Sequence, residues 1–201
     1  MDVDKVLEAL KAGGVVVYPT ETLYAIGCAA TDDGACRRVA EIKARDMNKP
    51  LPLIIGWPEG IHAVTEEVPD GVQALADAFW PGPLSILVKA RPGLSSLVSD
   101  REGYTSVRLS PHPVAAELSR RAGVPLVATS ANMSGMPAAA VPDELDPGVL
   151  ARTDGAYLGK PWPQGGEPST VVRVLDGRRL QVIRSGAVDL EQLEEQGFSV
   201  T

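Results

Sequence analysis

Two polar clusters in this sequence carry residue types that could bind an anionic ligand. The run Thr-Ser-Ala-Asn-Met-Ser-Gly at 129–135 follows three apolar residues and offers hydroxyls, one amide and many backbone N–H groups with little bulk. A loop of this kind at the end of a buried strand can wrap a polar, negatively charged ligand. The second cluster, Lys43-x-Arg45, lies far upstream and supplies two cations. We expect the fold to assemble one site from both clusters.

Each cluster also has an ordinary structural interpretation. Cations in the last turn of a helix offset its C-terminal dipole and usually stay solvated, which alone would explain Lys43 and Arg45. Residues two apart on a helix point in different directions, so both reach one ligand only if the helix ends between them. The polar run 46–50, which ends in proline, favours such an ending. Ser130 and Asn132 could equally form a turn that caps the next segment.

Other polar residues at strand ends and turns leave two interpretations open. Arg108 lies either at a sheet edge or in a cleft, where it would fork a carboxylate or a phosphate. His112, between two prolines, is either a base or a turn histidine that bonds the backbone, whereas His62 is predicted to lie at the surface. Ser169 is either a cleft residue or a hydroxyl at a strand start, and Arg184 is either a phosphate clamp or a plain strand end.

Composition limits the classes of function. With 201 residues and 44% hydrophobic content, the chain has enough apolar residues for one core. The formal net charge of −7 disfavours nonspecific nucleic-acid binding, with a local basic cleft left open. Cys28 and Cys36 match neither a C-x-x-C motif nor a disulfide framework, which indicates a reducing compartment. The sequence shows no signal peptide and no apolar run that could span a bilayer, so we expect a cytoplasmic protein without membrane attachment.

Several common motifs are missing. Neither the G-x-x-x-x-G-K-[ST] loop nor a strand-linked G-x-G-x-x-G is present, which excludes the two common nucleotide-binding loops. H-E-x-x-H and paired Cys/His spacings are also missing, so no metal site is predicted. The lack of a G-x-S-x-G elbow disfavours an α/β-hydrolase.

Apolar periodicity and turn residues predict interleaved helices and strands. Helices are predicted over 3–10, from 32 or 33 to 43–45, over 70–79 and 113–122, and after Asp189. Strands are predicted over 15–18, 53–55, 84–88, 105–109, 126–128, 171–175 and 180–184. Asp176-Gly177 predicts a type I′ hairpin between the last two strands, 136–148 an exposed loop or short helix, and 159–168 a flexible loop. These elements indicate an α/β fold with a twisted mixed sheet and helices packed on it, in a single domain over 1–201.

Six short elements follow one another in order along nearly the whole chain. They are G-V-V-V-Y-P-T-E-T-L-Y-A-I-G at 14–27, I-K-A-R with K-P-L at 42–51, W-P-G-P-L-S at 80–85, V-R-L-S-P-H-P at 107–113, T-S-A-N-M-S-G at 129–135 and S-T-V-V at 169–172. Together they resemble the YrdC-like family, the threonylcarbamoyl-AMP synthases, in its short single-domain branch. Two positions depart from the family pattern, since Asp46 stands where many members have proline and Arg184-Ser185-Gly186 replaces R-P-G.

The resemblance implies a function. A member of this family condenses L-threonine, bicarbonate or CO₂, and ATP into threonylcarbamoyl-adenylate in an open concave cleft and releases pyrophosphate. Mg²⁺ would arrive with the ATP, mainly bound by phosphates and water. The product would pass to threonylcarbamoyl-transferase proteins that modify adenosine 37 of tRNA, while tRNA binding by this chain itself is expected to be weak or absent.

By motif position, the resemblance also assigns roles to residues. Lys43 and Arg45 would clamp the phosphates and stabilise the charge that develops in the transfer. The other residues expected to bind ATP are Lys49, Ser130, Asn132 and Arg184. The residues expected to bind threonine are Thr22, Arg108 and Ser169. No covalent nucleophile is required.

Two competing functions stay open. One is an RNA-binding module without chemistry of its own, which would need a concave basic face and a steep salt dependence of RNA affinity. The other is a carbamoyl-transfer relative of the same fold, which would accept carbamoyl phosphate as donor. The intact Ser130-x-Asn132 element favours the threonine enzyme.

Overall fold

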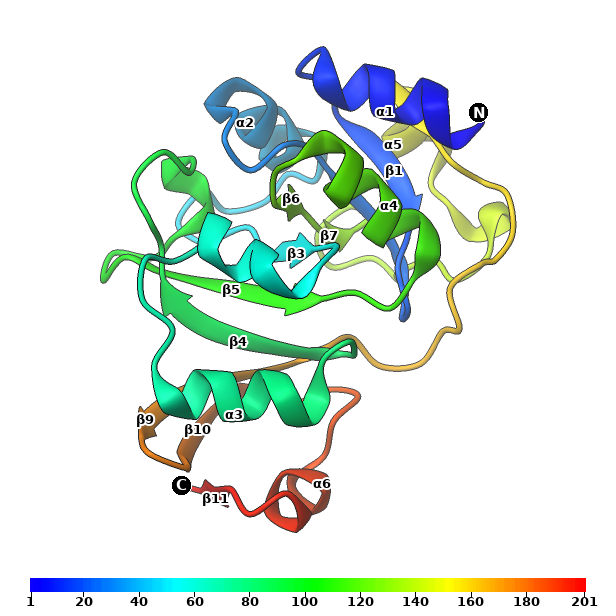
Figure 1. Cartoon of the computed structure of the whole chain (residues 1–201). Helices are drawn as coiled ribbons and strands as arrows, with labels where there is room; N and C mark the ends of the chain where they lie inside the picture. The colour runs from blue at the N-terminus through cyan, green and yellow to red at the C-terminus, as the bar shows by residue number, and fades with distance from the viewer.

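The computed structural model describes all residues 1–201, as helices and strands that alternate along the chain (Figure 1). The helices are α1 (Val3–Lys11), α2 (Asp33–Ile42), α3 (Asp70–Phe79), α4 (Pro113–Ala122), α5 (Pro147–Leu150) and α6 (Leu190–Glu195), with three 3₁₀ turns, η1 (Pro58–Ala63), η2 (Ser96–Val98) and η3 (Pro142–Glu144). None of the helices is long and apolar enough to cross a membrane.

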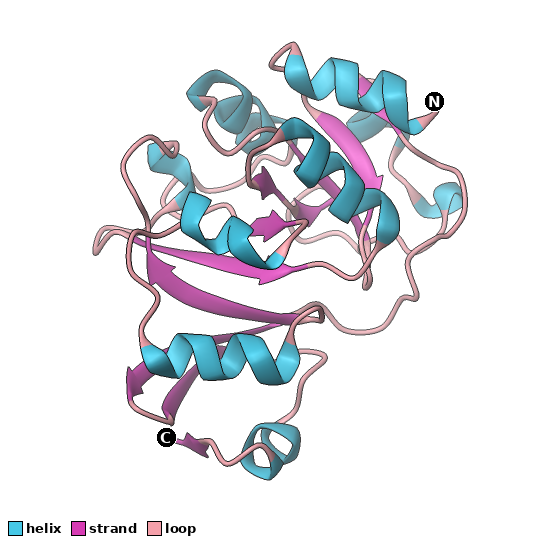
Figure 2. Cartoon of the chain, viewed as in Figure 1, coloured by secondary structure: helices cyan, strands magenta, loops and turns pink.

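The strands form two mixed sheets (Figure 2). The four-stranded sheet has the order β7 (Thr129–Ser130), β2 (Tyr24–Gly27), β1 (Val16–Pro19), β8 (Gly155–Ala156). The seven-stranded sheet has the order β11 (Ser199–Val200), β10 (Arg179–Arg184), β9 (Thr170–Asp176), β4 (Leu84–Lys89), β5 (Tyr104–Leu109), β3 (Leu53–Ile55), β6 (Leu126–Val127). The predicted α/β fold with mixed strand pairing is confirmed, but the strands are divided between two sheets rather than joined in one.

Local sequence explains where the helices begin and end. The carboxylate of Asp2 accepts a hydrogen bond from the backbone N–H of Lys5 and caps α1. Asp32 caps α2 in the same way, through the N–H of Ala35. Helix α4 ends at Gly123, whose φ of 73° is left-handed and suits glycine. The predicted helix boundaries therefore agree with the structure to within a few residues.

Two apolar clusters hold the helices on the sheets. In the smaller cluster, buried residues of α1 and α4, such as Leu7 and Leu118, pack against β1 and against Ile54 of β3. The larger cluster joins both sheets and includes α2, through Val39 and Ile42. Helices α1 and α4 lie together at the top of Figure 1, and α3 covers the lower part of the seven-stranded sheet. Both sheets therefore share a common interior.

The two sheets meet where β6 lies against the end of β2. The hydroxyl of Tyr18 donates a hydrogen bond of 2.6 Å to the carbonyl of Val127. The backbone N–H of Val127 donates to the carbonyl of Cys28, 2.9 Å away. Just beyond Val127 the chain leaves β6 and pairs with β2 as β7, with Ser130 opposite Ala25. This crossing places the 129–135 loop beside the turn that follows β1.

The predicted hairpin is present, but its turn differs from the prediction. Asp176 pairs with Arg179, so the two central residues are Gly177 and Arg178 rather than Asp176 and Gly177. Only Gly177 has a positive φ, of 48°. A type I′ turn needs positive φ at both central residues, whereas type II′ needs it only at the first. The type I′ prediction was therefore wrong, because it placed the turn one residue too early.

The crossing of β6 and β2 makes glycine necessary at position 27. A Cβ atom there would lie 1.7 Å from the carbonyl oxygen of Val127, and that oxygen belongs to a buried strand that cannot move aside. We expect Gly27→Ala to lower the free energy of unfolding by roughly 3 kcal/mol. Urea denaturation followed by circular dichroism measures this.

Gly34→Ala is the matched control for Gly27→Ala. Position 34 lies in the first turn of α2, where a Cβ atom would meet only a side-chain oxygen of Asp32 at 3.3 Å. Alanine should leave the stability unchanged or raise it by up to roughly 1 kcal/mol. Equal losses in the two variants would contradict the proposed backbone clash.

Candidate active site

The chain turns sharply between Lys43 and Arg45. Helix α2 ends at Ile42, Lys43 forms its C-terminal cap, and Ala44 adopts a φ of 47°. A left-handed conformation is unusual for alanine and redirects the chain within one residue. The chain therefore changes direction between the two cations, just after the helix cap, as it must if both side chains are to serve one site.

Lys43 reaches the 129–135 loop directly. Its Nζ donates hydrogen bonds to the carbonyls of Ser130 and Asn132, the latter at 2.6 Å, and lies 3.5 Å from the side-chain oxygen of Asn132. The carbonyl of Lys43 in turn accepts from the N–H of Ser134 at 3.0 Å. Lys43 thus joins the two distant polar clusters, as the sequence predicted. Its two short contacts are to backbone carbonyls, so it holds the loop in shape.

Burial changes the proton affinity of Lys43. The residue is 3% exposed. Burial and the nearby charge of Arg45 lower the pKa of Lys43 to about 8. The side chain is still mostly protonated at neutral pH, where its three N–H groups match the three oxygens that surround it.

Arg45 is held by the short loop that follows it. Its Nε and Nη2 donate to the carbonyls of Lys49 and Pro50 at 3.2 and 2.9 Å. The carboxylate of Asp46 accepts from the backbone N–H of Asn48 at 2.9 Å. This Asx turn closes the loop without proline. The remaining N–H groups of Arg45 stay available to a ligand.

Arg108 forms a buried ion pair with Glu21. Its Nε donates to Oε1 of Glu21 at 2.6 Å, and the hydroxyl of Ser110 donates to Oε2 at 2.6 Å. Burial alone would raise the pKa of Glu21, but Arg108 and Ser110 outweigh it and hold the pKa below its ordinary value. Glu21 is therefore charged at neutral pH. The two Nη groups of Arg108 donate to no other residue.

Arg184 is held beside Ser169. Its Nη2 donates to the carbonyl of Ser169 at 2.6 Å and to its hydroxyl at 3.2 Å. The hydroxyls of Ser169 and Ser85 lie 3.0 Å apart. Gly186 lets the chain return close to this point, since a Cβ atom there would lie 2.1 Å from the carbonyl oxygen of Pro168. This close approach holds the segment after Arg184 against Pro168 without a proline at position 185.

These groups surround one cavity of about 150 Å³. Its polar lining consists of Thr20, Thr22, Arg45, Arg108, Thr129, Ser130, Ser169 and Arg184, and its apolar lining of Leu23, Tyr24, Ala25, Pro52, Ala128 and Pro168. No Asp or Glu side chain lines it. Burial, together with the charges of Arg108 and Arg45, lowers the pKa of Arg184. The three guanidinium groups therefore repel one another across a small cavity. This arrangement suits a ligand with more than one negative charge.

Six of the predicted site residues line this cavity and three do not. Those that line it are Thr22, Arg45, Arg108, Ser130, Ser169 and Arg184. Lys49 is exposed and offers only its carbonyl to Arg45. The amide of Asn132 donates to the carbonyls of Met133 and Met136, so its side chain braces the turn. Lys43 is buried and contacts the carbonyls of the 129–135 loop rather than the cavity.

His112 bonds the backbone at a turn and does not act as a base. Its Nδ1 accepts from the N–H of Val114 at 3.3 Å and caps α4. Its Nε2 lies 3.1 Å from the carbonyl of Pro161, to which the neutral ring donates. Burial lowers the pKa of His112, which favours that neutral form. The interpretation of His112 as a backbone-bonding histidine is confirmed, and His62 is exposed as predicted.

The loop 159–168 lies against the cavity. It runs along one side of the molecule between β8 and β9 (Figure 1). The N–H groups of Gln164 and Gly165 donate to the carbonyls of Glu21 and Thr22 at 3.3 and 2.9 Å. Pro168 itself lines the cavity. The segment predicted as a flexible loop therefore contributes a wall of the site.

Sequence reasoning missed Glu21 as a site residue. The motif at 14–27 contains Glu21, but the resemblance gave a role only to Thr22. The signal was present, since an acidic residue in an apolar stretch needs a cationic partner, and Arg108 lies on another apolar strand. The apolar side of the cavity, formed by Leu23, Tyr24 and Ala25, was also missed. These residues lie in or beside the short strand β2, which no turn residues set apart in the sequence.

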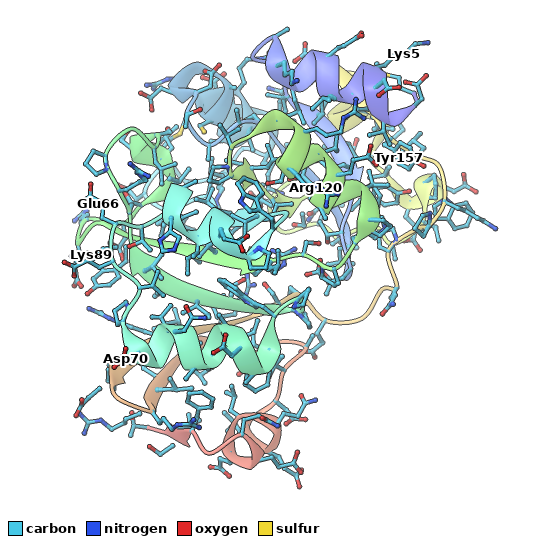
Figure 3. All side chains as sticks on the ribbon, in the orientation of Figure 1. Lys5, Glu66, Asp70, Lys89, Arg120 and Tyr157 are labelled. Carbon is cyan, nitrogen blue, oxygen red and sulfur yellow. The ribbon has the colours of Figure 1, made fainter.

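A second cavity of about 500 Å³ lies at the opposite end of β4. Its lining includes Glu66, Asp70 and Lys89, which Figure 3 places on the side of the molecule away from Tyr157. None of the predicted site residues lines it. Its mixed charges lack the cationic excess of the first cavity, so the smaller cavity is the candidate site.

Comparison with known proteins identifies the family. A family model named Sua5, YciO and YrdC, with the description telomere recombination, matches residues 8–186. The chain belongs to the Sua5/YciO/YrdC family. A threonylcarbamoyl-AMP synthase of Stenotrophomonas maltophilia is 34% identical over 190 residues, which cover 90% of this chain and 98% of that protein. The resemblance found in the sequence motifs is therefore confirmed.

Solved structures of the Sua5/YciO/YrdC family share the fold. P. abyssi Sua5 complexed with L-threonine superposes with a TM-score of 0.88 at 26% identity, over 99% of this chain and 58% of that one. E. coli YciO superposes with a TM-score of 0.83 at 23% identity, over 95% of this chain and 92% of that one. The chain thus spans less than two thirds of P. abyssi Sua5 but nearly all of YciO.

The left-handed turn at Ala44 gives a prediction about stability. Alanine in a left-handed conformation destabilises the folded protein by roughly 1–2 kcal/mol. Glycine removes this strain, but it also increases the conformational entropy of the unfolded chain, which offsets part of the gain. We expect Ala44→Gly to raise the free energy of unfolding by roughly 0.5–1 kcal/mol. Ala74→Gly, in the interior of α3, should lower it by roughly 1 kcal/mol. Equal destabilisation in both variants, measured by urea denaturation, would show that Ala44 is unstrained.

Burial of Lys43 gives a prediction about pH. The folded pKa of about 8 lies below the ordinary 10.5, so between these values the unfolded chain binds more protons than the folded one. The free energy of unfolding should therefore rise between pH 8 and pH 10.5, relative to a Lys43→Met variant that lacks the group. Below pH 8 the difference between the two proteins should stay constant. Urea unfolding across pH 7 to 10.5 tests this, and a difference that falls or stays flat above pH 8 contradicts it.

Proposed function

We propose that this protein is a threonylcarbamoyl-AMP synthase that condenses L-threonine, bicarbonate or CO₂, and ATP and releases pyrophosphate. The observation that supports this most is the cavity in which Arg45, Arg108 and Arg184 converge without a lining carboxylate. The threonine carbamate and ATP both carry negative charge, and their approach to one another requires cations that are already in position. Family membership and the similar synthase of S. maltophilia point to the same activity.

The chemistry needs orientation more than bond-making side chains. The amine of threonine and CO₂ form a carbamate, and a carbamate oxygen attacks the α-phosphorus of ATP while pyrophosphate leaves. Holding an unstable carbamate in line with the phosphate contributes up to ~7–11 kcal/mol through positioning alone. A covalent nucleophile is unnecessary, which fits a cavity lined by cations and hydroxyls.

The cavity volume suggests where each substrate binds. At about 150 Å³ it lies below the roughly 300 Å³ at which pockets for drug-sized ligands begin, so it fits an amino acid. Arg108 binds the threonine carboxylate as a two-pronged fork, and Thr22 and Ser169 bond its other polar groups. The nucleotide extends from the cavity toward solvent. Arg45 and Arg184 contact its phosphates, and Ser130 contacts the nucleotide from β7.

Lys43, Asn132 and Lys49 act less directly than the motif positions imply. Lys43 and Asn132 brace the loop that carries Ser130. Nζ of Lys43 lies 3.5 Å from Oδ1 of Asn132, its longest contact, so the N–H group on that side is the one that can turn toward a phosphate. Lys49 is exposed in the loop that holds Arg45, and its side chain contacts a phosphate of the bound nucleotide from outside the cavity.

We propose that Mg²⁺ enters with ATP. No group of three or more His, Cys, Asp or Glu side chains is arranged to hold a metal ion. Phosphate oxygens and water would therefore supply its ligands, as is usual for Mg²⁺ with a nucleotide. The residues of the cavity then contact the phosphate oxygens that the ion leaves free.

The wider role follows from the product. A mixed anhydride is unstable in water, so we propose direct delivery to threonylcarbamoyl-transferase proteins that modify tRNA, with little tRNA binding by this chain. We further propose that the reaction takes place in the cytoplasm, a compartment in which Cys28 and Cys36 would stay as free thiols. We also propose that residues 1–201 act as a single domain, since the larger apolar cluster joins both sheets.

Labelled bicarbonate tests the proposed function. With ATP and L-threonine present, label should appear in threonylcarbamoyl-AMP, separated by chromatography, with one pyrophosphate released per product. Omission of threonine or bicarbonate should leave almost no ATP consumption. Robust ATP hydrolysis without them would contradict the proposal, and product formed from carbamoyl phosphate instead would indicate a carbamoyl-transfer relative.

Removal of a cation should abolish this activity. Arg45→Ala should lower kcat/KM by about 100-fold or more, because one preformed contact to developing charge is lost. Lys43→Ala should lower it as strongly, since it frees the loop around Ser130. Lys5→Ala, on the exposed face of α1, is the control and should keep wild-type turnover. Wild-type turnover in Arg45→Ala would count against the assignment.

A further inference from the structure

Glu21 forms the one ion pair between a carboxylate and an arginine of the cavity, and no role above uses it. Glu21 is 9% exposed and Arg108 is 5% exposed, so water does not compete for their contact. Both residues come from segments far apart in the chain, the turn after β1 and the end of β5. The pair therefore fixes the position of one segment against the other.

The contact fixes the orientation of the Arg108 side chain. Glu21 Oε1 accepts from Nε of Arg108 and not from either Nη group. Oε2 is held by the hydroxyl of Ser110, so the carboxylate cannot rotate to follow a displaced guanidinium. With Nε anchored, the plane of the guanidinium is set, and its two Nη groups are the ones that remain for the cavity. These are the groups that form a parallel pair of hydrogen bonds with a carboxylate.

A purely structural role explains this arrangement less well. Buried ion pairs are often no more stabilising than apolar residues of similar volume, so stability alone is weak grounds for one. Arg45 and Arg184 also show that neutral oxygens suffice to hold a guanidinium beside this cavity. Only Arg108, the arginine assigned to the substrate carboxylate, is held by a charged partner, and that partner contacts its Nε.

We propose that Glu21 is a positioning residue that orients Arg108 for the carboxylate of the amino-acid substrate. This inference rests on the proposed function, because it assigns the threonine carboxylate to Arg108. Glu21 touches no substrate itself and acts through the geometry and charge of its partner. Ser110 supports it by holding the second carboxylate oxygen.

The Glu21→Gln variant tests the proposal. Glutamine keeps an acceptor oxygen for Arg108 and nearly the same volume, but it loses the charge and presents an amide to Ser110. The KM for L-threonine should rise about tenfold, whereas kcat and the KM for ATP should stay within twofold. Thermal unfolding shows whether the variant is folded, and Glu21→Asp, which keeps the charge but moves it, replaces it if needed and should raise the same KM.

A double-mutant cycle separates positioning from other roles. Arg108→Lys keeps a charge but loses the fork, so it should raise the KM for threonine by itself. If Glu21 acts through Arg108, Glu21→Gln should add less than twofold to the effect of Arg108→Lys. Fully additive effects would overturn the inference, as would an unchanged KM for threonine in Glu21→Gln or an equal effect on ATP.

The same experiment distinguishes this inference from the proposed function. If the wild-type protein forms no threonylcarbamoyl-AMP, the proposed function fails, and the role of Glu21 fails with it because no threonine carboxylate is then bound by Arg108. If the wild type is active and Glu21→Gln matches it in the KM for threonine, only the role of Glu21 fails.

Discussion

Mutual repulsion among Arg45, Arg108 and Arg184 is the constraint on which the rest of the site depends. Three guanidinium groups border one small cavity, and only Arg108 has an acidic partner. Such a cluster is unfavourable without counter-charge, so each arginine must be anchored by a neighbouring acceptor group. Backbone carbonyls anchor Arg45, Ser169 anchors Arg184 and Glu21 anchors Arg108. The cavity therefore favours an anionic ligand, which would supply the charge that the protein leaves out.

The two-sheet architecture makes this cluster possible. Arg108 lies near the end of β5, Arg184 at the end of β10, and Ser130 at the end of β7, so the seven-stranded and four-stranded sheets both contribute. Arg45 reaches the same cavity only because the chain reverses at Ala44. Lys43, immediately before this reversal, holds the 129–135 loop from behind. One turn of chain thus positions a ligand-facing cation and a loop-bracing cation together.

Much of this could be predicted from the sequence, because local signals dominate where they are strong. Caps such as Asp2 and Asp32, and the apolar stripe of each helix, gave the helices, and the polar types at 43–45 and 129–135 indicated a shared site. Features set by strand register, by the rotation of one side chain or by contacts between distant segments were not predictable. Asp176 pairs with Arg179 because of the strand register, which moves the turn, and Asn132 turns toward Met133 and Met136 instead of the cavity. The partnership of Glu21 with Arg108 likewise needs both sheets in place.

Isotope exchange between pyrophosphate and ATP tests the central claim most directly, because it reports reversible adenylate formation in this cavity. With wild-type protein, labelled pyrophosphate should enter ATP only when L-threonine and bicarbonate are both present, and threoninol, which lacks the carboxylate that Arg108 is expected to bind, should not replace threonine. Exchange that is independent of threonine, or equally fast with threoninol, would contradict the account.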